Sequence, residues 1–119
     1  MKTVLYVDDE QLNLLIFRGN FQTEFNVLVA ENGELGLRVL KENESIVAVI
    51  SDMKMPKMNG IEFIKNVKGH KPELPCFLLS GYDLTPEISE AKKNKLVVDF
   101  FQKPIDIPKV KKAIDDLLD

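Results

Sequence analysis

Five short apolar runs occur along the chain, and longer segments with helical spacing lie between them. The runs read TVLYVD, NVLVA, IVAVIS, PCFLLS and VVDFF, at residues 3–8, 26–30, 46–51, 75–80 and 97–101. Several are apolar at consecutive positions, which is typical of strands covered on both faces in a parallel sheet. The pattern therefore predicts five parallel strands that are largely buried.

The intervening segments predict five helices, because apolar or small residues recur three or four positions apart in them. These residues are Leu12, Leu15, Ile16 and Gly19, then Leu35, Val39 and Leu40, then Ile61, Ile64 and Val67, then Ile88 and Ala91, and finally Val110, Ala113, Ile114 and Leu117. Asn59 and Glu62 have capping-box spacing, and Thr85 and Asp106 each place a capping oxygen ahead of a proline. Strict alternation of strand and helix favours right-handed crossovers and a doubly wound α/β fold. We expect one domain over residues 1–119.

Composition and charge narrow the function classes. With 119 residues, 45% hydrophobic and 29% charged, the chain resembles an ordinary soluble domain. A formal charge of −3 provides no basic field for nucleic acid. The chain has neither an apolar run of about 18 residues nor a signal-peptide pattern, so we expect a cytoplasmic protein that binds no membrane. One cysteine, Cys76, and one histidine, His70, exclude an internal disulfide and multi-thiolate or multi-histidine metal sites.

Three consecutive carboxylates follow an apolar strand in LYVDDE, residues 5–10. Charges this close repel and lose hydration at the end of a buried strand, so a compensating partner is expected. Ligands of a doubly wound sheet bind outside the carboxyl ends of its strands. This rule brings Asp8, Asp9, Asp52, Ser80 and Lys103 to one edge. Oxygen ligands without imidazole or thiolate favour Mg²⁺. A solvated helix N-terminus is the alternative interpretation of DDE taken alone.

Four motifs in this order resemble the receiver domain of two-component response regulators. They are VDDE at 7–10, SDMKMPKMNG at 51–60, LLSG at 78–81 and FFQKP at 100–104, and the resemblance covers essentially the whole chain. It implies a flavodoxin-like (βα)5 fold with strand order 2-1-3-4-5. It also implies a switch that takes a phosphoryl group from a phosphohistidine donor onto Asp52.

The resemblance assigns further roles around Asp52. Asp9, Asp52 and the backbone carbonyl of Lys54 would bind Mg²⁺, and Asp8 would assist in part through water. The Ser80 hydroxyl, the backbone NH of Gly81 and the Lys103 ammonium would hold the phosphoryl oxygens. A carboxylate nucleophile, positioned with cations around it, is sufficient for this chemistry. The Lys103–Pro104 bond would be cis, as is usual in the family.

Phe100 lies three residues before Lys103, at the family's aromatic switch position. By resemblance, Ser80 moves toward the phosphoryl group, and Phe100 turns inward and alters the face of the fourth helix, fifth strand and fifth helix. The alternative is that Phe100 and Phe101 are simple packing partners. Lys54 and Tyr82 occupy two positions that, by resemblance, often tune the lifetime of the acyl phosphate. Whether they lengthen or shorten this lifetime is left open. Leu96 replaces a glycine that is frequent before the last strand.

A histidine kinase or histidine phosphotransfer protein is the implied donor, with a downstream protein as the other partner. The domain would phosphorylate and dephosphorylate itself rather than turn over a substrate. We expect no output domain after the fifth helix, so output would run through protein contacts, through phosphorelay to another histidine protein, or through a longer chain from which this one derives. Dimerisation on phosphorylation is left open. Asn13, four residues after Asp9, resembles the residue found there in receivers fused to hybrid sensor kinases, which hints that this chain derives from a larger one. The lysines at 92–95 and 109–112 are interpreted first as a solvated face. Binding of an acidic partner is the second interpretation, and no direct binding of nucleic acid is expected.

Two other classes remain as alternatives. A phosphohydrolase of the haloacid dehalogenase type would need an acid two residues after the nucleophile, where Lys54 stands, and room for a substrate cap. A binding module that never accepts phosphate would be favoured by loss of Asp9, Asp52 or Lys103, and all three are present.

Overall fold

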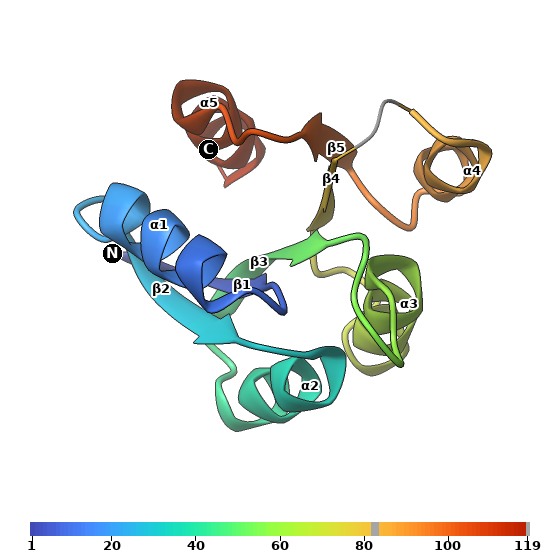
Figure 1. The fold of residues 1–119 in the computed structure, drawn as a ribbon. Coiled ribbons are helices and arrows are strands. Elements are labelled where there is room, and N and C mark those ends of the chain that lie inside the picture. Colours follow the sequence, from blue (N-terminus) through green and yellow to red (C-terminus); the bar gives the residue numbers. More distant parts are fainter. Residues whose placement is uncertain (82–83, 119) are drawn as a thin grey trace.

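The computed structural model describes residues 1–81 and 84–118 as one parallel five-stranded sheet with helices on both faces (Figure 1). The strands are β1 Lys2–Val7, β2 Phe25–Ala30, β3 Ile46–Asp52, β4 Cys76–Ser80 and β5 Asp99–Gln102. The helices are α1 Gln11–Phe21, α2 Gly33–Glu42, α3 Gly60–His70, α4 Pro86–Lys93 and α5 Ile107–Leu118. The spatial order β2-β1-β3-β4-β5 confirms the predicted fold and strand order.

Two apolar cores form because each face of the sheet is covered (Figure 1). One core joins the sheet to α2, α3 and α4 around Leu40, Phe63 and Ile88. The other joins it to α1 and α5 around Phe17 and Ile114. Burial on both faces explains why the strand sequences are apolar at consecutive positions. Within the described residues, no helix combines the length and the apolar character that a membrane span requires.

The buried face of α1 is not the row that its spacing indicated. Leu12, Leu15 and Ile16 are 66%, 65% and 43% exposed, whereas Leu14, Phe17 and Phe21 face the core. The reason is aromatic packing: the Phe17 ring stacks on Tyr6 with centroids 4.1 Å apart, and large rings bury more surface than aliphatic side chains. Two helical rows compete along this segment, and the aromatic row is buried.

The fifth strand begins two residues later than predicted, at Asp99. The amides of Leu96 and Val97 donate to the Ala91 carbonyl at the end of α4, at 2.9 and 3.4 Å. Lys95 adopts the left-handed backbone that ends this helix, with φ of 61°. The residue with this left-handed backbone is therefore Lys95. It directly precedes Leu96, the residue that stands where the family often has a glycine.

The predicted caps are present. Asn59 and Glu62 exchange reciprocal hydrogen bonds in a capping box at the start of α3, and the Thr85 hydroxyl accepts from the Ile88 amide at 3.2 Å. Asp106 accepts from the Lys109 amide at 3.1 Å. These caps fix where α3, α4 and α5 begin, next to the carboxyl edge of the sheet.

Candidate functional site

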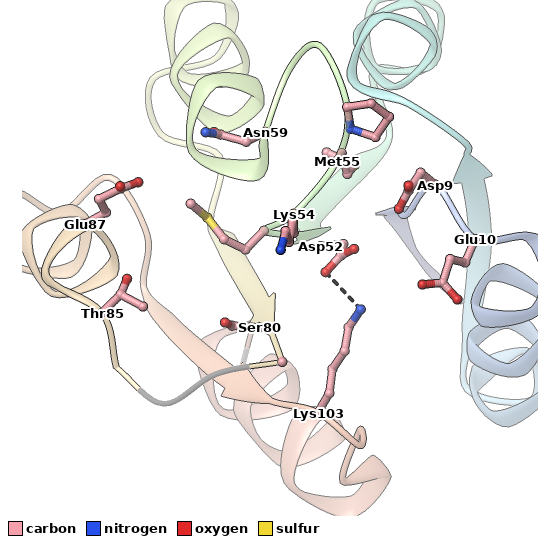
Figure 2. A pocket seen from close by; sticks show the side chains of 13 residues that line it. Asp9, Glu10, Asp52, Lys54, Met55, Asn59, Ser80, Thr85, Glu87 and Lys103 are labelled. Carbon is pink, nitrogen blue, oxygen red and sulfur yellow. Dashed lines mark ion pairs between the residues drawn. The ribbon is translucent and has the colours of Figure 1, made fainter.

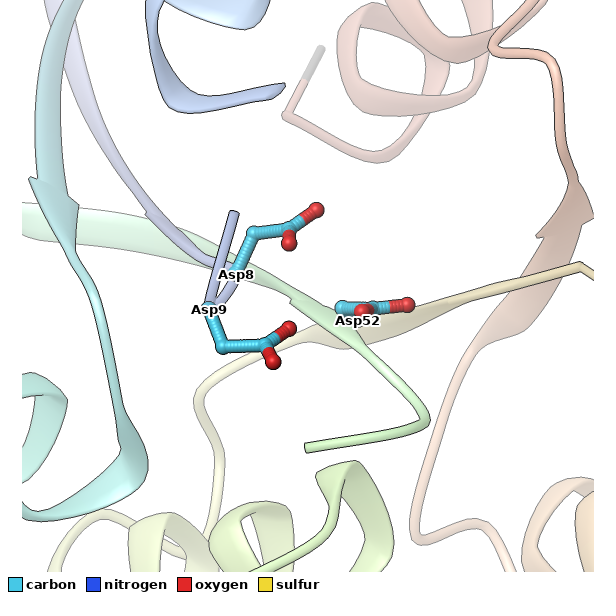
Figure 3. A group of neighbouring side chains, drawn as sticks. All are labelled: Asp8, Asp9 and Asp52. Atoms are coloured by element: carbon cyan, nitrogen blue, oxygen red, sulfur yellow. The ribbon is translucent and has the colours of Figure 1, made fainter. Parts of the chain in front are cut away.

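Three carboxylates meet at the carboxyl edge of the sheet (Figure 3). Val7 of β1 pairs with Ser51 of β3, so the chain reaches Asp8 and Asp52 side by side. One oxygen from each of Asp8, Asp9 and Asp52 lies within 4.8 Å of the others. Asp8 and Asp52 are buried, and Asp9 is exposed. The structure thus brings together the predicted acidic cluster.

Lys103 supplies a cation from the residue after β5 (Figure 2). Its ammonium lies 3.0 Å from Asp52 Oδ1 and 3.9 Å from Asp8 Oδ2. The Lys103–Pro104 peptide bond is cis, as expected from the resemblance. Burial raises the pKa of Asp52 above its ordinary value, although the hydrogen bond from Lys103 opposes this shift. Burial would lower the pKa of Lys103, but the hydrogen bond and charge of Asp52 raise it overall.

Asp8 is compensated by neighbours that the sequence reasoning did not connect with it. The Tyr6 hydroxyl donates to Asp8 Oδ2 at 2.6 Å, and Asn13 Nδ2 donates to the same oxygen at 3.2 Å. The Glu10 amide donates to Oδ1 at 3.0 Å. Burial and the adjacent Asp8 raise the pKa of Tyr6, so the phenol stays protonated as a donor. The sequence contained a signal for the contact between Tyr6 and Asp8, because residues two apart along a strand point to the same face.

A cleft of about 900 Å³ opens above the carboxylates. Asp52, Ser80 and Lys103 face it from three strand ends (Figure 2). Ser80 is buried and Lys54 is exposed at its rim. Gly81 also lines the cleft, and a Cβ there would meet none of the described atoms within 4 Å. Thr85 and Glu87 at the start of α4 complete the wall. The sequence suggested Thr85 only as a helix cap and gave no role to Glu87.

The donor set fits Mg²⁺. Three carboxylates face one ammonium, so the cluster carries excess negative charge. Every ligand that the cluster offers is an oxygen, and Mg²⁺ in proteins is commonly bound by one or two carboxylates together with waters. Asp9 and Asp52 provide two such carboxylates beside the cleft.

The switch position is placed between core and surface. Phe100 is half-buried against the core that includes α3 and α4, while Phe101 is buried on the opposite face and stacks on Phe77 at 5.5 Å. The role of Phe100 as a switch stays a prediction. Tyr82 lies outside the described residues.

Three of the six lysines at 92–95 and 109–112 form ion pairs with neighbouring acids. Lys92 pairs with Asp99 at 3.2 Å, Lys111 with Glu24 at 3.0 Å and Lys112 with Asp116 at 2.8 Å. These exposed pairs agree with a solvated surface.

A doubly wound sheet with clustered carboxylates and a lysine at its carboxyl edge defines a receiver-type signalling domain. The family model for the response regulator receiver domain matches residues 4–115. The chain belongs to this family, and its general role is that of a phosphoacceptor in two-component signalling.

Relatives and solved structures agree with this assignment. The transcriptional regulatory protein GlrR of Escherichia coli K12 is 32% identical over 98% of this chain, which spans only 26% of that relative. A response regulator receiver domain protein from Clostridium thermocellum superimposes with a TM-score of 0.91 at 29% identity, over 98% of this chain and 93% of that one. The response regulator TrrA from Thermotoga maritima, solved with Mg²⁺-BeF, has the same fold, with a TM-score of 0.85 at 24% identity over 98% and 99% of the two chains.

Proposed function

We propose that the Asp52 carboxylate accepts a phosphoryl group from a phosphohistidine donor. The supporting observation is its placement: Asp52 is 3% exposed, faces the cleft, and has Lys103 at 3.0 Å and two carboxylates beside it. An Asp52 oxygen attacks phosphorus, the P–N bond to the donor imidazole breaks, and the imidazole leaves with the bonding electron pair. The product is an acyl phosphate on Asp52.

The remaining roles follow from charge and position. Lys103 neutralises developing charge on the phosphoryl oxygens, and the Ser80 hydroxyl and Gly81 NH donate to them. Asp9, Asp52 and the Lys54 carbonyl, with Asp8 assisting, would hold Mg²⁺, which when bound would supply a second positive charge to the same oxygens. The acidic cluster would otherwise repel an incoming phosphoryl group, which is the physical reason for requiring the ion.

The donor is a histidine kinase or a histidine phosphotransfer protein. An apolar row on α1, formed by Leu12, Leu15 and Ile16, is exposed. Ile16 and Lys103 line one smaller cavity, and Lys103 also lines the acidic cleft, so the row lies beside the route to Asp52. Contact with this row would align a donor histidine with the carboxylate. Leu15→Arg should slow labelling by an autophosphorylated kinase while leaving labelling by acetyl phosphate unchanged.

Phosphorylation then alters the α4-β5-α5 face for a downstream protein. Ser80 moves toward the phosphoryl group, and the half-buried Phe100 ring turns inward. Dimerisation through this face is a further outcome to be measured by light scattering before and after phosphorylation. Phosphorelay to another histidine protein, as for a receiver belonging to a hybrid sensor kinase, is the second output route.

Intact mass after incubation with acetyl phosphate tests the proposal. The parent should gain one phosphoryl group in the presence of Mg²⁺ and none after chelation, and Asp52→Asn should gain none. Asp116→Asn is the matched control, because it makes the same acid-to-amide change on the exposed side of α5.

Beryllofluoride binding separates a short-lived adduct from an unreactive site. Mg²⁺-dependent binding without a mass adduct would indicate rapid hydrolysis of the acyl phosphate. If the parent shows neither, the chain is a binding module that works without phosphorylation. A mass adduct that persists in Asp52→Asn would place the acceptor elsewhere.

A further inference from the structure

The Asp8 carboxylate is held by protein donors at both oxygens. Oδ2 accepts from the Tyr6 hydroxyl at 2.6 Å and from Asn13 Nδ2 at 3.2 Å, and Oδ1 accepts from the Glu10 amide at 3.0 Å. A carboxylate offers about four lone-pair sites, so these bonds occupy most of them. In the described part of the chain, every buried polar side-chain atom has a partner. Asp8 therefore needs no ion to satisfy it.

Both side-chain donors are fixed by rigid elements. Tyr6 lies two residues before Asp8, at the same face of β1, and its ring stacks on Phe17 with an interplanar angle of 8°. Asn13 stands in the first turn of α1. Lys103 Nζ lies 3.9 Å from the same Oδ2 atom. A bound ion could take Oδ2 directly only by displacing these donors.

We propose that Tyr6 and Asn13 are positioning residues that keep Asp8 Oδ2 out of direct contact with the bound ion and thereby set the preference of the site for Mg²⁺ over Ca²⁺. The inference rests on the proposed function, because it assumes an ion held by Asp9 and Asp52. Mg²⁺ retains several waters and accepts few carboxylates, whereas Ca²⁺ takes six to eight oxygen ligands in flexible geometry. A third direct carboxylate would therefore favour Ca²⁺ more than Mg²⁺.

Isothermal titration of the unphosphorylated protein with each ion tests this inference. The variants are Tyr6→Phe, Asn13→Ala and the double variant, and the measured quantity is the ratio of the Ca²⁺ and Mg²⁺ dissociation constants. Partners that orient metal ligands change affinity by on the order of tenfold or more. We expect the double variant to shift the ratio about tenfold toward Ca²⁺, with each single variant in between.

Two controls separate positioning from packing. Phe21→Leu disturbs the same aromatic cluster at the ring beyond Phe17, and it keeps both the Tyr6 hydroxyl and the Phe17 ring that stacks on Tyr6. Asn20→Ala removes an amide from the same helix that donates to the Ile16 carbonyl instead of to Asp8. Both controls should retain the ion preference of the parent. Circular dichroism and urea unfolding check that each protein is folded.

The outcomes distinguish the two proposals. An unchanged ratio, or equal weakening of both ions, would overturn the positioning role while leaving the parent's Mg²⁺-dependent phosphorylation intact. The same shift in Phe21→Leu would also overturn it, because packing alone would then explain the effect. A parent that binds neither ion and gains no phosphoryl group would overturn the proposed function together with this inference.

Discussion

Replacing Gly60 by alanine should destabilise this protein strongly, although alanine is the best helix former and Gly60 opens α3. A Cβ at this position would run into the Asp52 carbonyl oxygen and lie 2.8 Å from Leu78 Cδ2 and 2.9 Å from Met53 Cα. Two of these atoms belong to backbone that is held in place, because the Gly60 amide donates to the Met53 carbonyl at 2.8 Å. The clash cannot be relieved by rotating a side chain.

The magnitude follows from comparison with Gly69 in the same helix. Overpacking a tight site costs about 1–3 kcal/mol, and a clash against backbone belongs at the upper end. Nothing described lies within 4 Å of a Cβ at Gly69. Gly69→Ala should therefore stabilise the protein by about 0.5–1 kcal/mol through helix propensity. The two substitutions should differ by about 3–4 kcal/mol, a large part of the stability of a typical domain.

Urea unfolding followed by far-UV circular dichroism measures both variants. For a loss of about 3 kcal/mol and a slope of about 1–3 kcal/mol per molar, the midpoint of Gly60→Ala should fall by on the order of 1–3 M. Its labelling by acetyl phosphate should also slow, because Asp52 must move with its own carbonyl. If Gly60→Ala and Gly69→Ala unfold at the same urea concentration, the close approach of α3 to the Asp52 backbone is wrong.

Three further predictions concern the end of α4, the charge of Asp52 and the single thiol. Lys95→Gly should stabilise the protein by about 1 kcal/mol in urea unfolding, because the left-handed backbone at φ 61° disfavours side chains. Lys93→Gly, at the last residue of α4, should destabilise it instead. Because the pKa of Asp52 is raised on folding, the parent should lose stability relative to Asp52→Asn as pH rises above about 4 without divalent ions. Urea titrations between about pH 4 and 8 measure this, and a constant difference would contradict it. Burial raises the pKa of Cys76 to about 12, so Ellman's reagent should react with this thiol only after unfolding; fast reaction in the native state would contradict its burial.

The alternation of strands and helices could be predicted from the sequence because both periods are strong. The apolar runs are buried on both sides, and the caps at Asn59 and Thr85 need only local chemistry. The meeting of Asp8, Asp52 and Lys103 followed from the rule that parallel strands end at one edge. Cys76 is buried, as its place in a strand pattern indicated.

Other features depended on contacts that spacing does not determine. The apolar row of Leu12 and Leu15 and the aromatic row of Phe17 and Phe21 both have helical spacing, and only the partner across the interface decides which is buried. The link between Asn13 and Asp8 depends on the angle at which α1 leaves β1. The start of β5 depends on how α4 ends, since the Ala91 carbonyl accepts the amides of Leu96 and Val97.

Asp52 ends β3, the central strand, which is paired along both sides with β1 and β4. Opening a doubly paired strand breaks hydrogen bonds to two neighbours and exposes apolar side chains on both faces, so its amides should exchange with solvent only in globally unfolded molecules. β5 is an edge strand paired with β4 alone. Its amides, and those of α4 beside it, can open in partial excursions at a lower free energy. The proposed acceptor carboxylate thus lies at the end of a strand that is paired on both sides, and a conformational response to its phosphorylation would cost less at the singly paired β5 edge.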